Sequence, residues 1–152
     1  AYWIFRTSWV YSLRRPCFVT KVLQWAREHE TLRIVDDQIS SPTWARTLAE
    51  ATTQMIAQGK NKILDFIKEN SGLYHLACAG QCSRYEWAKA ILDCDPSIKE
   101  QTMKRLLPAK TSDFPTPASR PQFSALSLNK IQDKFHLQLP DWRDSLFVCH
   151  CE

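Results

Sequence analysis

The sequence predicts an α/β fold with a helical carboxyl-terminal lobe, and three observations carry this prediction. Short apolar runs typical of buried strands alternate with segments whose apolar residues recur at helical spacing. The last third of the chain shows helical spacing and a proline-rich segment rather than further strands. The 152 residues match the length of one domain, and 44% of them are hydrophobic. We therefore expect one soluble domain with a few parallel strands and flanking helices.

The first third of the chain predicts two strands around one helix. The run from Trp3 to Tyr11 suits an interior parallel strand, because its apolar patches fit burial on both faces. After a break at Arg14-Arg15-Pro16, helical spacing of apolar residues predicts an amphipathic helix over Phe18 to Ala26. A short strand follows at Leu32 to Val35. Asp36-Asp37-Gln38 then lie at its carboxyl end, where open α/β sheets place ligand-binding groups.

The middle third predicts a helix, a second short helix and a strand. Ser41-Pro42-Thr43 suits a helix start, since a serine caps exposed amides and a proline fits the first turn. Residues Lys60 to Asn70 predict a second short helix or an extension of the first. The run Leu73 to Ala77 reads as a short buried strand. The apolar face of the first helix comprises Trp44, Leu48, Met55 and Ile56.

The last part of the chain predicts helices separated by an irregular segment. Ser83-Arg84-Tyr85-Glu86 has the pattern of a capping box, which predicts a helix to about Asp93. A further helix is expected over Ile98 to Leu107, ended by Pro108. Half of the eight prolines lie within residues 108–121, which predicts a lid-like loop. The final two helices are placed at Leu128, Ile131 and Phe135, and after an Asp141 cap.

Composition excludes several classes of function. Three glycines, far apart in the chain, cannot form a G-x-G-x-x-G turn or a phosphate loop. The net charge of +4 comes from scattered residues, so no nucleic-acid interface is expected, and no apolar run is long enough for a membrane span. The six cysteines suggest reduced thiols and a cytoplasmic location. Cys149-His150-Cys151 offers metal ligands without a matching partner pair, so a metal site there is the lesser alternative.

Six blocks of the sequence, in order, resemble the dTDP-4-dehydrorhamnose reductases, which are extended short-chain dehydrogenase/reductases. The likeness runs from about Ile4 to Leu146, and the order of the blocks makes it specific. The blocks are Arg6 to Tyr11, Val35 to Gln38 with Ser41 to Thr43, Gly72 to Leu76, Ser83 to Ala88, Arg120-Pro121, and Leu139 to Arg143.

The resemblance implies the carboxyl-terminal, substrate-binding part of a Rossmann-like reductase. Such enzymes use NADPH to reduce the 4-keto carbon of a dTDP-linked deoxysugar in dTDP-rhamnose synthesis. Their glycine-rich cofactor turn and catalytic Tyr-x-x-x-Lys helix belong to an amino-terminal half that residues 1–152 do not include. We therefore expect one sugar-nucleotide-binding region that does not bind NADPH tightly, is inactive alone and carries no catalytic residue or metal ligand.

One segment does satisfy the spacing Tyr-x-x-x-Lys. Tyr85 and Lys89 lie one turn apart on an expected helix, where the ammonium would lower the pKa of the phenol. The family resemblance opposes a catalytic role, because this segment matches a later helix. We expect a surface pair.

The resemblance also suggests residues that contact ligands. Trp9 is expected to pack against the sugar, Gln38 to hydrogen-bond the thymine or sugar, and Arg120 to meet the diphosphate. Thr43 is a further candidate for substrate contact. Tyr11 is the candidate for cofactor contact, although Ser12 follows it where the family has glycine.

Two other interpretations stay open at this point. The family includes the non-catalytic regulatory β subunit of methionine adenosyltransferase, so the chain is alternatively a binding subunit. A decayed or truncated product is the third interpretation. A homodimer is a further expectation, because an exposed first strand offers an edge to a second copy.

Overall fold

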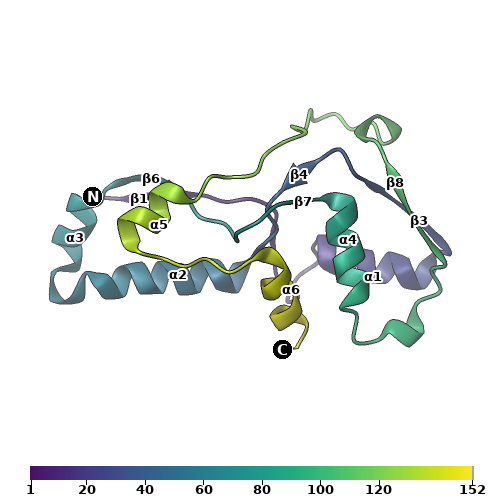
Figure 1. The fold of residues 1–152 in the computed structure, drawn as a ribbon, viewed down its shortest axis with the longest axis horizontal. Helices are drawn as coiled ribbons and strands as arrows, with labels where there is room; N and C mark the ends of the chain where they lie inside the picture. The colour runs from purple at the N-terminus through teal and green to yellow at the C-terminus, as the bar shows by residue number, and fades with distance from the viewer. Residues whose placement is uncertain (152) are drawn as a thin grey trace.

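In a computed structural model, which describes residues 1–151, the chain is an elongated α/β molecule (Figure 1). Its strands are β1 (Trp3–Arg6), β2 (Val10–Tyr11), β3 (Thr31–Val35), β4 (Ile39–Ser40), β5 (Thr43–Trp44), β6 (Gly72–His75), β7 (Cys82–Ser83) and β8 (Arg105–Ala109). Its α-helices are α1 (Phe18–Glu28), α2 (Ala45–Gln58), α3 (Ile63–Glu69), α4 (Arg84–Asp93), α5 (Asn129–Phe135) and α6 (Trp142–His150). The 3-10 turns are Lys60–Lys62, Ile98–Glu100 and Thr111–Asp113.

The strands form short pairs rather than one wide sheet. β1 pairs with β6, β2 with β5 and β3 with β8, all parallel, whereas β4 and β7 are antiparallel. Figure 1 places β1, β6, α3 and α5 at one end of the molecule and β3, β8 and α1 at the other. The predicted α/β class with parallel strands is confirmed.

Local capping signals give the helix boundaries that the sequence predicts. Ser83 Oγ accepts a hydrogen bond from the Glu86 amide, and the Glu86 carboxylate accepts one from the Ser83 amide, so the capping box of α4 is present. Asp141 Oδ1 accepts from the Arg143 amide at the start of α6. The short second helix is also confirmed as α3.

The predicted long first strand is wrong, because it is divided into β1 and β2. Trp9 lies between them with a φ of +41°, a left-handed value that interrupts an extended chain. Burial on both faces is wrong as well. Ile4 is 49% exposed, and among residues 1–151 the only strand that pairs with β1 is β6.

The helix predicted over Ile98 to Leu107 is also wrong. Residues Ile98–Glu100 make one 3-10 turn, and Arg105–Ala109 form β8, which pairs in register with β3. Pro108 is part of this strand, opposite Ile34. A proline lacks the N–H of a ladder hydrogen bond and is tolerated at a sheet edge, which is where β8 lies.

The long helix α2 begins later than Ser41-Pro42 predicts. Thr43 and Trp44 pair with β2, which keeps them extended, and the helix starts at Ala45. Ser41 does not cap it, because its hydroxyl donates to the Gly80 carbonyl at 2.7 Å. Ile56 was expected on the apolar face, yet it is 48% exposed.

Two separate hydrophobic clusters hold the molecule together. We call them the Trp87 core and the Phe135 core, after one fully buried aromatic side chain of each. The Trp87 core comprises Tyr11, Val19, Val22, Ala26, Leu32, Ile34, Trp44, Cys78, Cys82, Trp87, Ala88, Ile91, Leu92, Trp142, Leu146 and Cys149. The Phe135 core comprises Ala51, Met55, Tyr74, Leu76, Ala77, Leu128, Ile131, Phe135, Leu137 and Leu139. Within residues 1–151, no helix combines the length and apolar character needed to cross a membrane.

Candidate functional site

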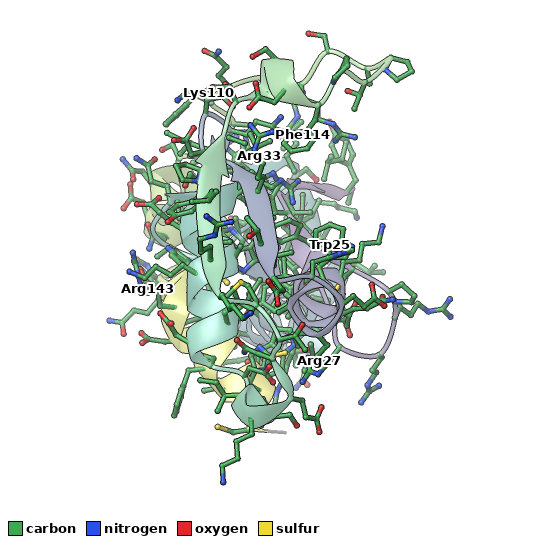
Figure 2. The ribbon with its side chains drawn as sticks, turned by 90° about the vertical axis from the view of Figure 1, so that its right-hand side faces the viewer. Trp25, Arg27, Arg33, Lys110, Phe114 and Arg143 are labelled. Atoms are coloured by element: carbon green, nitrogen blue, oxygen red, sulfur yellow. The ribbon has the colours of Figure 1, made fainter. Side chains whose placement is uncertain are left out.

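A cavity of about 340 Å³ lies beside β3, between α1, the start of α4 and the segment after β8. This volume is in the range of small-molecule sites. Its lining combines aromatic rings, amide and hydroxyl groups, and arginines. The residues are Phe18, Trp25, Arg33, Ile34, Val35, Gln38, Arg84, Thr111, Phe114, Thr116 and Arg120. Figure 2 shows Arg33, Phe114 and Trp25 on this side of the molecule.

Parallel pairing of β3 and β8 brings their polar carboxyl ends together. Asp37 accepts hydrogen bonds from the Thr111 amide at 3.0 Å and the Thr111 hydroxyl at 2.7 Å. The hydrogen bond from that hydroxyl is the main reason that the pKa of Asp37 is lowered. Asp36 pairs with Lys110 at 2.9 Å. The two aspartates therefore order this end of the strand pair.

Gln38 is held by the same network and lines the cavity. Its Nε2 donates to Thr111 Oγ1 at 3.1 Å. Because the Thr111 hydroxyl proton is committed to Asp37, that oxygen can only accept from Gln38, which fixes the orientation of the amide. The Gln38 side-chain carbonyl oxygen accepts no hydrogen bond from residues 1–151. It is therefore an unused acceptor on a cavity-lining residue.

The three arginines of the cavity have different surroundings. Arg33 is neutralised by Asp113 at 2.6 Å and lies over the Phe114 ring. Arg120, a predicted site residue, makes no ion pair within the described chain. Neither does Arg84, which the sequence predicts only as part of a capping pattern. The sequence feature that could have identified Arg84 as a site residue is its place as a cation in the first turn of a helix, where the helix dipole favours an anion.

Trp9 contacts the cavity-lining residue Arg84 but does not itself line the cavity. Its indole stacks on Trp87, with ring centroids 5.5 Å apart and an interplanar angle of 11°, and the Arg84 guanidinium lies over it at 4.2 Å. Trp9 is not among the cavity-lining residues. A direct contact between Trp9 and a sugar stays a prediction.

Two other predicted site residues are enclosed in the described chain. Tyr11 is 1% exposed, and burial raises the pKa of its phenol well above the ordinary value. Thr43 is fully buried, with its hydroxyl donating to the Ser41 carbonyl and accepting from the Cys78 amide. Their ligand contacts stay predictions, and neither lines the cavity.

The residues present do not fit a dinucleotide cofactor. The phenol of Tyr11 is enclosed, and Gly80 serves internal packing, since a Cβ there would lie 2.6 Å from Asp141 Oδ2. A second cavity of about 720 Å³ lies beside Ser12, but Arg46 on its wall is already paired with Glu50. No part of residues 1–151 forms a glycine-rich phosphate cradle.

Neither the Tyr-x-x-x-Lys segment nor the carboxyl-terminal cysteines form an active centre in the described chain. The Tyr85 hydroxyl donates to the Leu106 carbonyl at 3.5 Å, while Lys89 is exposed. All six cysteines are free thiols. Across residues 1–151, no group of three or more histidine, cysteine or acidic side chains is arranged to hold a metal ion.

Comparisons with known proteins agree with the residue blocks. The sequence matches the family model described as RmlD substrate binding domain over residues 1–150. It is 36% identical over 148 residues to a dTDP-4-dehydrorhamnose reductase of Burkholderia thailandensis, covering 95% of this chain and 49% of that protein. It is also 36% identical over 141 residues to the Escherichia coli reductase of the same name, covering 92% of this chain and 46% of that protein.

Solved structures show the same relationship. A crystal structure of dTDP-4-dehydrorhamnose reductase from Bacillus anthracis, in complex with NADP, matches with a TM-score of 0.77 and 31% identity. That match covers 95% of this chain and 46% of the other. The chain thus spans about half the length of the curated relatives it matches.

Proposed function

Because this chain belongs to the RmlD substrate binding domain family, we propose that it supplies the sugar-nucleotide-binding part of a dTDP-4-dehydrorhamnose reductase. The observation that carries the proposal is the cavity at the carboxyl ends of β3 and β8. It joins aromatic walls, an oriented amide and arginines that have no anionic partner in residues 1–151. A dTDP-linked deoxysugar offers a flat base and a diphosphate to match them.

In this proposal the thymine packs among Phe18, Trp25 and Phe114, because flat aromatic surfaces stack favourably. The N3–H of thymine donates to the Gln38 carbonyl oxygen, which is unused in the described chain and cannot exchange places with Nε2. Arg120 binds the diphosphate through the fork of its guanidinium. Gln38 and Arg120 therefore keep the roles predicted from the sequence.

The cavity is proposed to bind substrate without performing the reduction. Its lining contains no histidine, cysteine, lysine, tyrosine or carboxylate side chain, so no lining residue can transfer a proton near neutral pH. We assign the binding of NADPH, which donates the hydride, to residues outside this sequence. The group that donates the proton is assigned to residues outside this sequence as well. Relatives about twice as long as this chain support the assignment.

Isothermal titration calorimetry with dTDP and dCDP tests the proposal. We expect dTDP to bind more tightly than dCDP, since cytosine presents an acceptor rather than a donor at N3. Arg120→Gln should weaken dTDP binding by about 10-fold to 100-fold, because it removes charge-assisted hydrogen bonds. Lys89→Gln, on the exposed face of α4, is the matched control and should bind like the parent chain.

Two results would contradict the proposal. One is the absence of dTDP binding, and the other is equal affinity for dTDP and dCDP together with an unaffected Arg120→Gln variant. NADPH oxidation by the 152-residue chain with the 4-keto sugar nucleotide would contradict the assignment of catalysis to other residues.

A further inference from the structure

The guanidinium of Arg84 lies on a shelf of aromatic rings instead of against a carboxylate. Its central carbon is 4.2 Å from the ring centroid of Trp9, 4.8 Å from that of Phe18 and 5.9 Å from that of Trp87. Trp9 reaches this place with a φ of +41°, which is unfavourable for a bulky residue. Strained backbone of this kind is often retained where it positions functional groups.

Other arginines of the described chain show what Arg84 lacks. Arg27 binds Asp95 at 3.1 Å and Glu100 at 3.0 Å. Arg143 also lies over an indole ring, 4.4 Å from the centroid of Trp142, yet Asp141 is within 4.0 Å of it. Figure 2 shows Arg143 on the far side of β3 and β8 from Trp25. Arg84 has similar stacking but no anion.

A second cation, Arg120, makes the partial burial of the charged Arg84 side chain less favourable. Burial, and after it the positive charge of Arg120, lowers the pKa of Arg84 from 12.5 to about 10. Both side chains line the same cavity, and neither donates a side-chain hydrogen bond within residues 1–151. A partly buried cation that faces a second, exposed cation without a counter-ion is unfavourable, and an anion that contacts both removes the cost.

We propose that Arg84 is a second anion-binding residue, which acts with Arg120 to select ligands with two adjacent phosphates over ligands with one. The inference rests on the proposed function and deepens it, since Arg120 alone would accept a single phosphate. Each guanidinium fork suits one phosphate group, and the aromatic shelf holds the Arg84 fork in place before the ligand arrives. Arg84 thereby determines specificity rather than catalysing a step.

Calorimetric titration with thymidine, dTMP, dTDP and inorganic pyrophosphate tests this inference. Arg84→Met keeps an unbranched apolar stem against the rings and removes the charge. We expect it to weaken dTDP and pyrophosphate binding by about 10-fold to 100-fold, with a smaller loss for dTMP and none for thymidine. Arg84→Lys should bind dTDP and pyrophosphate with affinities between those of the parent chain and Arg84→Met, because an ammonium keeps the charge but not the fork. Arg143→Met is the matched control, and should bind all four ligands like the parent chain.

A thermal denaturation measurement separates a binding role from a structural one. A lowered pKa in the folded chain means that charged Arg84 opposes folding at neutral pH, so Arg84→Met should have an equal or higher Tm. An unchanged preference for dTDP over dTMP in Arg84→Met, or a lowered Tm with unchanged binding, would overturn the inference and leave the proposed function standing. A third outcome separates the two proposals. If Arg84→Met lost pyrophosphate binding while the parent chain bound dTDP and dCDP equally, the result would support the Arg84 site and contradict the thymine-nucleotide function. Absence of both dTDP and pyrophosphate binding would overturn both.

Discussion

The two hydrophobic cores differ in how they treat polar groups. In the Phe135 core, Phe135 makes edge contacts with Trp3 and Tyr74, and the polar atoms of those rings are satisfied. The Trp3 Nε1 and the Tyr74 hydroxyl both donate to the Asn70 carbonyl, at 3.0 and 2.8 Å. The core at this end of the molecule is internally complete.

The Trp87 core, in contrast, contains buried polar atoms that have no hydrogen-bond partner in residues 1–151. Within residues 1–151, four buried side-chain polar atoms have no hydrogen-bond partner, and three of them belong to this core. They are Tyr11 Oη, Trp87 Nε1 and Trp142 Nε1, with His150 Nε2 as the fourth. The unpaired Arg84 lies over the Trp87 ring at the cavity. The comparison teaches that, among residues 1–151, unsatisfied buried polar atoms are concentrated in the core that adjoins the proposed ligand cavity, although none of the four belongs to a cavity-lining residue.

The largest expected effect comes from the complete core. Phe135→Ala should lower the free energy of unfolding by about 3–5 kcal/mol, because Phe135 is fully buried and truncation leaves a cavity. Urea denaturation measures the loss. Phe147→Ala is the control, since Phe147 is 62% exposed and its removal should change stability by less than about 0.5 kcal/mol.

The milder Phe135→Leu variant tests whether the two ends act independently. It should remain folded and bind dTDP like the parent chain, because Phe135 does not line the cavity. If dTDP affinity fell by as much as it does in the cavity variants, the comparison between a structural core and a binding core would fail.

A smaller effect is expected at Asp95, which follows α4 and shows that the Trp87 end also contains satisfied buried charge. Its side chain is 1% exposed and pairs with Arg27, and Gln101 donates to it at 2.9 Å. Burial alone would raise the pKa of Asp95, but hydrogen bonds from Gln101 and Ser97 and the charge of Arg27 outweigh it and lower the pKa. Asp95→Asn should cost about 1–3 kcal/mol at pH 7.

The pH dependence of that cost follows from the lowered pKa. The ionised carboxylate stabilises the folded chain above its ordinary pKa of 3.8, and this stabilisation is lost as pH falls through the lower, folded-state value. The difference between the parent chain and Asp95→Asn, measured by urea denaturation, should therefore shrink as pH falls below about 4. A difference that stays constant from pH 7 to pH 3 would show that the charge of Asp95 does not stabilise the fold.

Elements whose signals are local could be predicted from the sequence. The capping box at Ser83 and the Asp141 cap depend on residues within one turn, so their helices were placed correctly. Elements that depend on pairing between segments far apart in the sequence could not be predicted. Residues 105–109 form a strand because they pair with β3, and Thr43 is extended because it pairs with β2. A short apolar run does not distinguish a helix from a strand.

The same distinction applies to the cavity. Gln38 and Arg120 could be predicted because one follows a strand and the other lies in a family block; both line the cavity, and their ligand contacts stay predictions. Arg84 was missed, since its meaning depends on Trp9, Phe18 and Arg120, which lie far from it in the sequence.

Amide and arginine side-chain NMR during titration of the chain with dTDP tests the central claim most directly. We expect the largest chemical-shift changes at Gln38, Arg84, Thr111 and Arg120, which line the cavity, and none at Ile131 or Phe135 of the other core. Changes centred on β1 and β6, or on the second cavity beside Ser12 and Arg14, with the first cavity unaffected, would contradict the account.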